Sequence, residues 1–163
     1  MRVFIPSLLV VLLDQSSKLW IKGNFYLGES LFINNFLTIR YVENPGIAFG
    51  IQVGDFRIVV TIISIVIALY LAFLLYTSKQ LFYAEKLSLS LILGGAIGNL
   101  IDRILIYIPN SNYTGVIDFI DIGIANHRWY IFNMADSAVT VGIILYLIYS
   151  TFFENKDITG NVR

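Results

Sequence analysis

Four long runs of apolar residues alternate with more polar segments along the chain. They cover residues 3–21, 58–75, 87–108 and 133–153. Each run is close to the roughly 20 residues that a helix needs to cross the hydrocarbon layer of a bilayer. The pattern therefore predicts four transmembrane helices in one polytopic membrane domain, residues 1–163.

The two long connections between these runs have patterns of their own. Within residues 31–42, two short apolar stretches flank Asn34 and Asn35, which predicts two strands joined at a turn. We expect them to form a small sheet on the membrane surface. The third connection, residues 109–132, contains a short apolar piece around Asp118, which indicates a loop that dips toward lipid.

Basic residues are nearly as numerous on one side of the predicted spans as on the other, but they are denser on the side of the termini. That side has Arg2, Lys79, Lys86, Lys156 and Arg163, whereas Lys22, Arg40, Arg57 and Arg128 are spread over two much longer segments. Lys and Arg are enriched in cytoplasmic loops. We therefore expect both termini in the cytoplasm and the long connections outside.

Composition supports a membrane protein, because 57% of the 163 residues are hydrophobic and only 13% are charged. The 11 basic and 11 acidic residues give zero net charge, and no block of like charge favours nucleic-acid binding. The chain has no cysteine and only one histidine, His127. Disulfides, thiolate nucleophiles and iron–sulfur clusters are thereby excluded, and we expect no metal site.

Several polar residues occupy the predicted spans, where lipid disfavours them. A carboxylate or guanidinium in hydrocarbon costs at least about 2.5–3.5 kcal/mol on insertion scales, so each is a candidate functional residue. In the first span, Asp14 and Lys18 stand at i and i+4 with the acid on the N-terminal side, the favourable order for an ion pair. This pair either neutralises itself near the interface or takes part directly in chemistry.

The third and fourth spans each carry polar groups on one face. In the third span, the residues within one arc of the helix are Gly95, Gly98, Asn99, Asp102 and Arg103. In the fourth, the polar seam consists of Asn133, Asp136, Ser137 and Thr140. The spacing of Gly94 and Gly98 predicts close helix packing. We expect Asp102 and Arg103 to support their neighbours, and N-terminal capping is the structural alternative for Asp136.

The predicted spans place three of these carboxylates toward the same side of the membrane. At a rise of 1.5 Å per residue, Asp14 lies ~17 Å from residue 3, Asp102 ~22 Å from residue 87 and Asp136 ~5 Å from residue 133, in a layer ~30 Å thick. Successive spans run in opposite directions, so all three lie in the half nearest the long connections. We expect one polar site there.

The residues available restrict the chemistry of such a site. The chain lacks the Gly-x-Ser-x-Gly motif of serine hydrolases, the His-Glu-x-x-His motif of zincins and the Gly-x-x-x-x-Gly-Lys-Ser/Thr motif of phosphate-binding loops. Aspartates remain as the candidate catalytic groups. Two carboxylates about 4 Å apart repel by ~4 kcal/mol at an effective dielectric of about 20, so one keeps its proton near neutral pH. Such a pair is both acid and base toward a peptide bond. Asp118 and Asp136 are the best candidates.

Five segments, in order along the chain, resemble the motifs of the bacterial lipoprotein signal peptidases, also called signal peptidases II. They are Asp14-Gln15-Ser16-Ser17-Lys18, Asn44-Pro45-Gly46-Ile47-Ala48-Phe49, Gly94-Gly95-Ala96-Ile97-Gly98-Asn99-Leu100-Ile101-Asp102-Arg103, Val116-Ile117-Asp118-Phe119-Ile120 and Phe132-Asn133-Met134-Ala135-Asp136-Ser137. The match spans nearly the whole chain. Its one departure is Ile47, where the family usually has alanine.

The resemblance implies a mainly α membrane protein. Its fold would be a four-transmembrane-helix bundle with a small extracytoplasmic β-sheet cradle at about residues 24–50 and a lid, formed by a loop or short helix, at about residues 109–132. The protein would be an aspartyl endopeptidase of the bacterial inner membrane. It would remove signal peptides from prolipoproteins by cutting just before a cysteine that bears diacylglycerol. We expect no cofactor, and a monomer whose partners are the prolipoprotein and membrane lipid.

The resemblance also implies roles for individual residues. Asp118 and Asp136 would be the catalytic pair. The residues that line or brace the substrate site would be Asn44, Gly46, Asn99, Arg103 and Asn133. Asp14, Lys18 and Asp102 would maintain the helix arrangement around it.

Two other classes of membrane protein also explain polar residues inside spans. A small transporter or proton-conducting subunit would need polar groups through both halves of the membrane, whereas residues 58–75 and 141–149 offer very few in the inner half. A purely structural or partner-binding protein would leave Asp118 and Asp136 dispensable.

Overall fold

The computed structural model describes residues 2–46, 56–77, 81–124 and 127–154. Its helices in chain order are α1 (Ile5–Asn24, preceded by the 3-10 turn η1, Arg2–Phe4), α2 (Arg57–Thr77), α3 (Tyr83–Leu105) and α4 (Met134–Tyr149, continued by the π-helical turn η4, Ser150–Glu154). The departure from the family pattern at Ile47 lies outside the described residues.

Four helical segments are long and apolar enough to cross a membrane: Arg2–Asn24, Arg57–Thr77, Tyr83–Leu105 and Met134–Phe152. The four predicted spans are therefore confirmed, and the chain is a multi-pass membrane protein. The third helix begins and ends earlier than the predicted range 87–108. Its start is stabilised by a cap, because the Glu85 carboxylate accepts a hydrogen bond of 2.9 Å from the Phe82 N–H.

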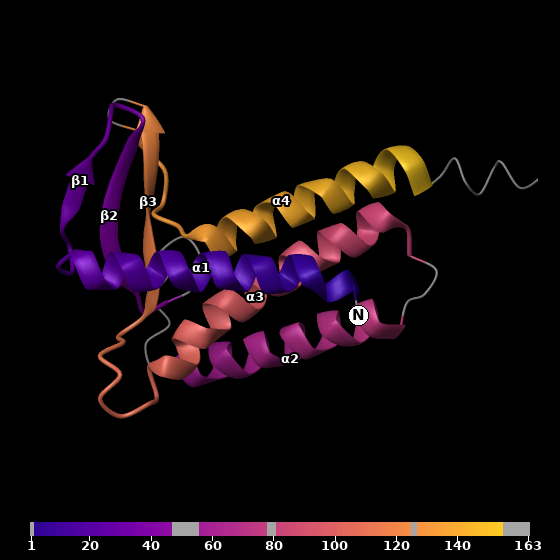
Figure 1. The fold of residues 1–163 in the computed structure, drawn as a ribbon, viewed down its shortest axis with the longest axis horizontal. Helices are drawn as coiled ribbons and strands as arrows, with labels where there is room; N and C mark the ends of the chain where they lie inside the picture. The colour runs from indigo at the N-terminus through magenta and orange to yellow at the C-terminus, as the bar shows by residue number, and fades with distance from the viewer. Residues whose placement is uncertain (1, 47–55, 78–80, 125–126, 155–163) are drawn as a thin grey trace, which may run out of the picture.

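Helix α3 lies at the centre of the bundle and packs closely against α1 and α4 (Figure 1). Small residues permit this approach. A Cβ added to Gly94 would lie 2.8 Å from the Ser7 carbonyl oxygen of α1, and one added to Gly142 of α4 would lie 2.8 Å from the Ser88 carbonyl oxygen of α3. The close packing predicted from the glycine spacing is thus confirmed.

A four-stranded antiparallel sheet lies at one end of the bundle, with its strands running across the helix axes (Figure 1). The strand order is β1 (Ser30–Phe32), β2 (Leu37–Asn44), β3 (Val116–Ile124) and β4 (His127–Arg128). The pair β1–β2 confirms the hairpin predicted within residues 31–42. In the central pair, Val42 of β2 lies opposite Asp118 of β3.

The third connection differs from the lid that was expected at residues 109–132. Residues Val116–Ile124 are not a loop or a short helix but strand β3, which pairs with β2 along most of its length. Valine and isoleucine favour strands, but the aspartates between them obscured that signal. The paired residues of β2 and β3 are 72 to 85 positions apart, from Asn44 opposite Val116 to Leu37 opposite Ile122, so this pairing is a tertiary interaction that the local pattern did not reveal.

An ion pair attaches the sheet to the end of α1. Lys22 Nζ lies 2.6 Å from Glu43 Oε1 of β2 and donates a hydrogen bond of 2.6 Å to the Asn112 carbonyl oxygen. Burial raises the pKa of Glu43, but hydrogen bonds from Lys22 and Thr114 outweigh it and the pKa is lowered. A buried apolar cluster of Ile21, Tyr41, Ile117 and Phe119 completes the contact between helix and sheet.

Candidate active site

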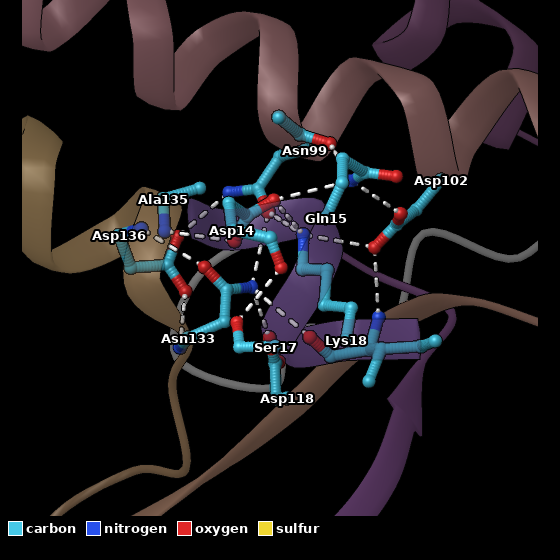
Figure 2. Close-up of polar contacts among 12 residues, drawn as sticks. Asp14, Gln15, Ser17, Lys18, Asn99, Asp102, Asp118, Asn133, Ala135 and Asp136 are labelled. Atoms are coloured by element: carbon cyan, nitrogen blue, oxygen red, sulfur yellow. Dashed lines mark hydrogen bonds and ion pairs between the residues drawn. The ribbon is translucent and has the colours of Figure 1, made fainter. Parts of the chain in front are cut away.

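The Lys18 side chain is buried at the centre of a polar cluster between α1 and α3 (Figure 2). Its ammonium lies 2.8 Å from Asp14 Oδ2, 2.9 Å from Asp102 Oδ2 and 3.0 Å from Asn99 Oδ1. An ammonium has three N–H donors, so each of them has an acceptor here. The predicted pairing of Asp14 with Lys18 is confirmed, and Asp102 is a second carboxylate partner.

The two carboxylates of this cluster also bind backbone N–H groups of neighbouring elements. Asp14 Oδ1 accepts a hydrogen bond of 2.9 Å from the Ala135 N–H in the first turn of α4. Asp102 Oδ2 accepts one of 3.1 Å from the Ile117 N–H in β3. Ala135 and Ile117 each directly precede one of the two candidate catalytic aspartates. The cluster therefore positions both backbone segments that carry them.

Gln15 belongs to the same cluster, although it was not among the predicted site residues. Its Nε2 lies 3.2 Å from Asp14 Oδ2, 3.1 Å from Asp102 Oδ1 and 3.0 Å from the Gly98 carbonyl oxygen. The close approach of α1 depends on Gly98, because a Cβ there would lie 2.6 Å from Asp14 Oδ2. The signal available in the sequence was an uncharged amide inside a span, where polar groups need partners.

Asn99 connects the charged cluster to α4. Its Oδ1 accepts hydrogen bonds of 3.0 Å from Lys18 Nζ and 3.0 Å from Asn133 Nδ2, while its Nδ2 donates one of 2.8 Å to Asp136 Oδ1. Because an ammonium can only donate, Lys18 fixes the orientation of the amide. The Nδ2 group is thereby directed at the Asp136 carboxylate, where it stabilises a negative charge.

Asn133 is fully buried and lies between Asp118 and Asp136 (Figure 2). Its Nδ2 donates a hydrogen bond of 2.6 Å to Asp118 Oδ1, and its Oδ1 accepts one of 2.9 Å from the Asp136 N–H. In return, Asp136 Oδ2 accepts a hydrogen bond of 3.2 Å from the Asn133 N–H. The last two bonds form a capping box, so the capping role considered for Asp136 is confirmed. One asparagine thus links both aspartates.

Asp118 is 4% exposed on strand β3. Burial raises the pKa of Asp118 to about 7, and the nearby charge of Asp136 contributes to the increase. Hydrogen bonds from Asn44 and Asn133 act in the opposite direction without cancelling it. With this pKa, Asp118 is mostly protonated below about pH 7, whereas an exposed aspartate is already ionised above about pH 4.

The end of strand β2 closes the site on another side. Asn44 Nδ2 donates a hydrogen bond of 3.3 Å to Asp118 Oδ2, and its Oδ1 accepts one of 2.9 Å from the Gly46 N–H. Arg103 of α3 and Gly46 line a small cavity next to this turn. The Arg103 charge interacts electrostatically with Asp136 and Asp118. The structure therefore brings together all ten residues that the sequence indicated, in one site at the sheet end of the bundle.

The chemistry that this arrangement can perform is proton transfer between a protonated carboxyl group and a nearby carboxylate. Among the residues that the structure describes, no group of three or more His, Cys, Asp or Glu side chains could hold a metal ion. The two carboxyl groups are held by neutral amides and are separated from the Lys18 ammonium by Asn99. They are therefore not neutralised by a direct ion pair with that ammonium.

Comparison with known proteins decides the family. The model for signal peptidase (SPase) II matches residues 7–153, which is most of the chain. This chain belongs to the signal peptidase II family. The family membership that the five ordered motifs predicted is confirmed, and the chain is a membrane peptidase.

Individual relatives in the signal peptidase II family are similar over most of their length. The lipoprotein signal peptidase of Blochmanniella pennsylvanica is 39% identical, over 92% of this chain and 90% of its own. That of Syntrophus aciditrophicus is 37% identical, over 91% of each chain. Two solved structures, each of a bacterial membrane enzyme, are 32% and 33% identical, with TM-scores of 0.79 and 0.76. They cover 98% and 94% of this chain, and this chain covers 91% and 94% of theirs.

Proposed function

We propose that this chain is an aspartyl endopeptidase that removes signal peptides from prolipoproteins, cutting immediately before a cysteine modified with diacylglycerol. The observation that carries the proposal is the link through Asn133 between a buried Asp118 and Asp136 at the start of a membrane-spanning helix. The relatives named lipoprotein signal peptidase support the choice of substrate. In this proposal, Asp118 and Asp136 touch the reacting atoms.

The raised pKa of Asp118 supports the following division of roles between the two carboxyl groups. Asp118 carries the proton and donates a hydrogen bond to the carbonyl oxygen of the scissile bond, while ionised Asp136 takes a proton from the attacking water. The water oxygen bonds to the carbonyl carbon, and the Asp118 proton passes to the carbonyl oxygen. The C–N bond then breaks as Asp136 gives its proton to the amine nitrogen, and a diol proton returns to Asp118.

The surrounding residues would hold the substrate and the pair in place. Asn44, Gly46 and Arg103 lie at the edge of the site, where donors to peptide carbonyl oxygens are needed. Asn99 and Asn133 orient the carboxyl groups, and the cluster of Asp14, Lys18 and Asp102 acts through the backbone as a positioning unit. We propose that the enzyme works as a monomer and without a cofactor.

The position of the site fits a lipid-modified substrate. The polar cluster contacts the sheet through the hydrogen bond from the Ile117 N–H to Asp102. The sheet lies at one end of the bundle, outside the four spans (Figure 1). Acyl chains can remain in the bilayer there while the peptide reaches water. From the distribution of basic residues, we propose that this end faces the extracytoplasmic side of the bacterial inner membrane and that both termini are cytoplasmic.

The distribution of charge disfavours the alternative of a transporter or proton-conducting subunit. Beyond Arg57, helix α2 has no charged residue, and α4 has only Asp136 in its first turn. In α3 the charged residues lie in the first and last turns, at Glu85 and Lys86 and at Asp102 and Arg103. In α1 the charged residues Asp14, Lys18 and Lys22 lie from the middle of the span to its sheet end. The described spans therefore offer no continuous chain of charged groups from this cluster to the end of the bundle away from the sheet.

The substrate assignment is tested with two versions of one precursor peptide, identical except that the cysteine bears diacylglycerol in one and is free in the other. We expect kcat/KM for the free-cysteine peptide to be at least about 100-fold lower, because each buried CH₂ of an acyl chain contributes about 0.8 kcal/mol to holding the substrate at the membrane. Mass spectrometry locates the cut. Equal turnover of both peptides, or a cut elsewhere, would contradict the assignment.

The protonation of the pair predicts a pH dependence. The active form needs one proton, and that proton is lost as the pH rises through the Asp118 pKa of about 7. We therefore expect kcat/KM to decrease about tenfold per pH unit above about pH 7. The measurement uses a precursor without ionisable groups next to the scissile bond, and enzyme returned to about pH 6 serves as the control for irreversible loss. A profile that stays flat to about pH 9 would be incompatible with the assigned roles.

A further inference from the structure

An apolar cleft of about 330 Å³ adjoins Asp136 where the segment that follows β4 meets the first two turns of α4. It is lined by Ile122, Trp129, Tyr130, Phe132, Asp136, Ser137, Thr140 and Val141, and is called the α4 cleft below. Ala135 and Gly142 face the central helix α3, so the helical period directs Thr140 and Val141 to the outer, lipid-facing side. The α4 cleft therefore opens to the bilayer and not to the interior of the bundle.

The walls of the α4 cleft are suited to an apolar ligand. On the sheet side, Trp129 contacts Tyr130 with ring centroids 5.5 Å apart, and Tyr130 contacts Phe132 at 6.0 Å. On the helix side, Ser137 Oγ donates to the Asn133 carbonyl oxygen at 2.9 Å and Thr140 Oγ1 to the Asp136 carbonyl oxygen at 2.8 Å. Both hydroxyl protons are thereby used within the helix, which leaves carbon surface toward the cleft.

The α4 cleft extends from the reacting groups toward the hydrocarbon layer. Asp136 lies in the first turn of α4, and Thr140 and Val141 lie about one turn deeper. Its volume is at the lower end of the roughly 300–1,000 Å³ that ligand pockets occupy. An apolar chain that enters at Asp136 and continues past Val141 stays in contact with the wall of the cleft as it passes from the membrane boundary into lipid.

We infer that the α4 cleft binds an acyl chain of the diacylglyceryl group on the substrate cysteine. The inference rests on the proposed function, in which that cysteine follows the scissile bond, so its lipid begins only a few bonds from the carbon that water attacks. A chain in the α4 cleft would remain in contact with the bilayer and would hold the scissile bond next to Asp136. Enzyme specificity for a lipid-modified cysteine then arises from this cleft.

The test fills the α4 cleft and varies the length of the acyl chain. Val141→Trp enlarges a side chain that lines the α4 cleft and also a second cleft of about 210 Å³ between α1 and α4. The Trp129 measurement below reports on the α4 cleft alone, because Trp129 lines only that cleft. Ile148→Trp is the matched control, because Ile148 lies two turns deeper on the same face and is 46% exposed, against 48% for Val141. Each variant is assayed with one peptide carrying either palmitoyl or butyryl chains on its glyceryl group.

We expect Val141→Trp to raise KM at least about tenfold for the palmitoyl substrate and to leave KM for the butyryl substrate unchanged, with both values unchanged in Ile148→Trp. An equal increase in KM for both substrates would indicate that the cleft binds the peptide. An unchanged KM for both would indicate that the cleft has no role in substrate binding. Both results overturn the inference while the proposed function stands. Failure of the unaltered enzyme to cut either substrate would instead overturn the proposed function.

A binding measurement covers the case in which Val141→Trp does not fold. The chain has two tryptophans, so Trp20→Phe leaves Trp129, which lines the cleft, as the sole tryptophan, and it can be excited selectively. This change is combined with Asp118→Asn to prevent turnover, and substrate with brominated acyl chains is added in vesicles of unbrominated lipid. We expect saturable quenching of Trp129 that excess unbrominated substrate reverses. Absence of quenching at saturating substrate would overturn the inference.

Discussion

Replacement of either Asp118 or Asp136 by asparagine is expected to reduce cleavage of the lipid-modified precursor at least about 10³-fold, within the range of 10²–10⁴ that a positioned acid or base contributes. Asparagine has nearly the same volume as aspartate, but it can neither give nor take the proton. Its Oδ1 can still accept the Asn133 hydrogen bond that each carboxylate now accepts. The variants should therefore accumulate in membranes while kcat falls.

Asp121→Asn is the matched control for this prediction. Asp121 lies on the same strand as Asp118 and is also buried, but it forms an ion pair with Arg128, with Nε 2.9 Å from Oδ1. It has no place in the proposed mechanism, so its variant should retain activity within a few-fold. If either dyad variant kept full activity, the aspartyl mechanism would be rejected even though the chain belongs to a peptidase family.

Lys18→Met is expected to destabilise the fold by about 3–5 kcal/mol, the usual cost of removing one partner from a buried ion cluster. Asp14 and Asp102 are both 0% exposed, and their carboxylates would face each other without the ammonium that now lies 2.8 Å and 2.9 Å from them. In detergent, the melting temperature should decrease by roughly 10 °C, at about 2–4 °C per kcal/mol for a chain of this size.

Two further variants determine whether this effect comes from the buried charge. Arg40→Met removes a cation from the exposed side of β2 and should change the melting temperature little. The triple variant with Asp14→Asn, Lys18→Met and Asp102→Asn removes all three charges while its amide oxygens can still accept the N–H groups of Ala135 and Ile117. It should recover a large part of the lost stability. A melting temperature unchanged in Lys18→Met would refute the role given to the cluster.

The spans and the polar residues inside them were predictable because both follow from local rules, whereas Asn44 and Gly46, in the first long connection, were indicated only by the resemblance to the family. About 20 apolar residues suffice to identify a span, and polar groups inside a span need partners whatever the fold. Asp14, Asp102 and Asp136 could be placed in the same half of the membrane because helix rise is constant. The capping role of Asp136 was also visible, since it depends on Asn133 three residues earlier.

The third connection, residues 109–132, shows where the local pattern was insufficient, because it predicted a loop where Val116–Ile124 form strand β3. Strand β3 exists because β2 pairs with it, with Asn44 opposite Val116 and Val42 opposite Asp118. That register places Asp118 near Asn133 and within reach of Asn44. Neither the strand nor the raised pKa of Asp118 could be derived from its neighbours in sequence, because both depend on burial by distant elements.

The sequence by itself determined that the chain has four membrane-spanning segments, that its polar residues gather toward one end of them, and that aspartates are the candidate catalytic groups. Hydrophobic run length and helical period set these properties residue by residue. Only the tertiary structure decided how the groups are connected. Asn133 links Asp118 and Asp136, while Asp14 and Asp102 accept hydrogen bonds from the N–H groups of the residues that precede this pair. A cleft also opens beside Asp136. These depend on contacts between segments far apart in the chain, which are fixed by packing and not by local pattern.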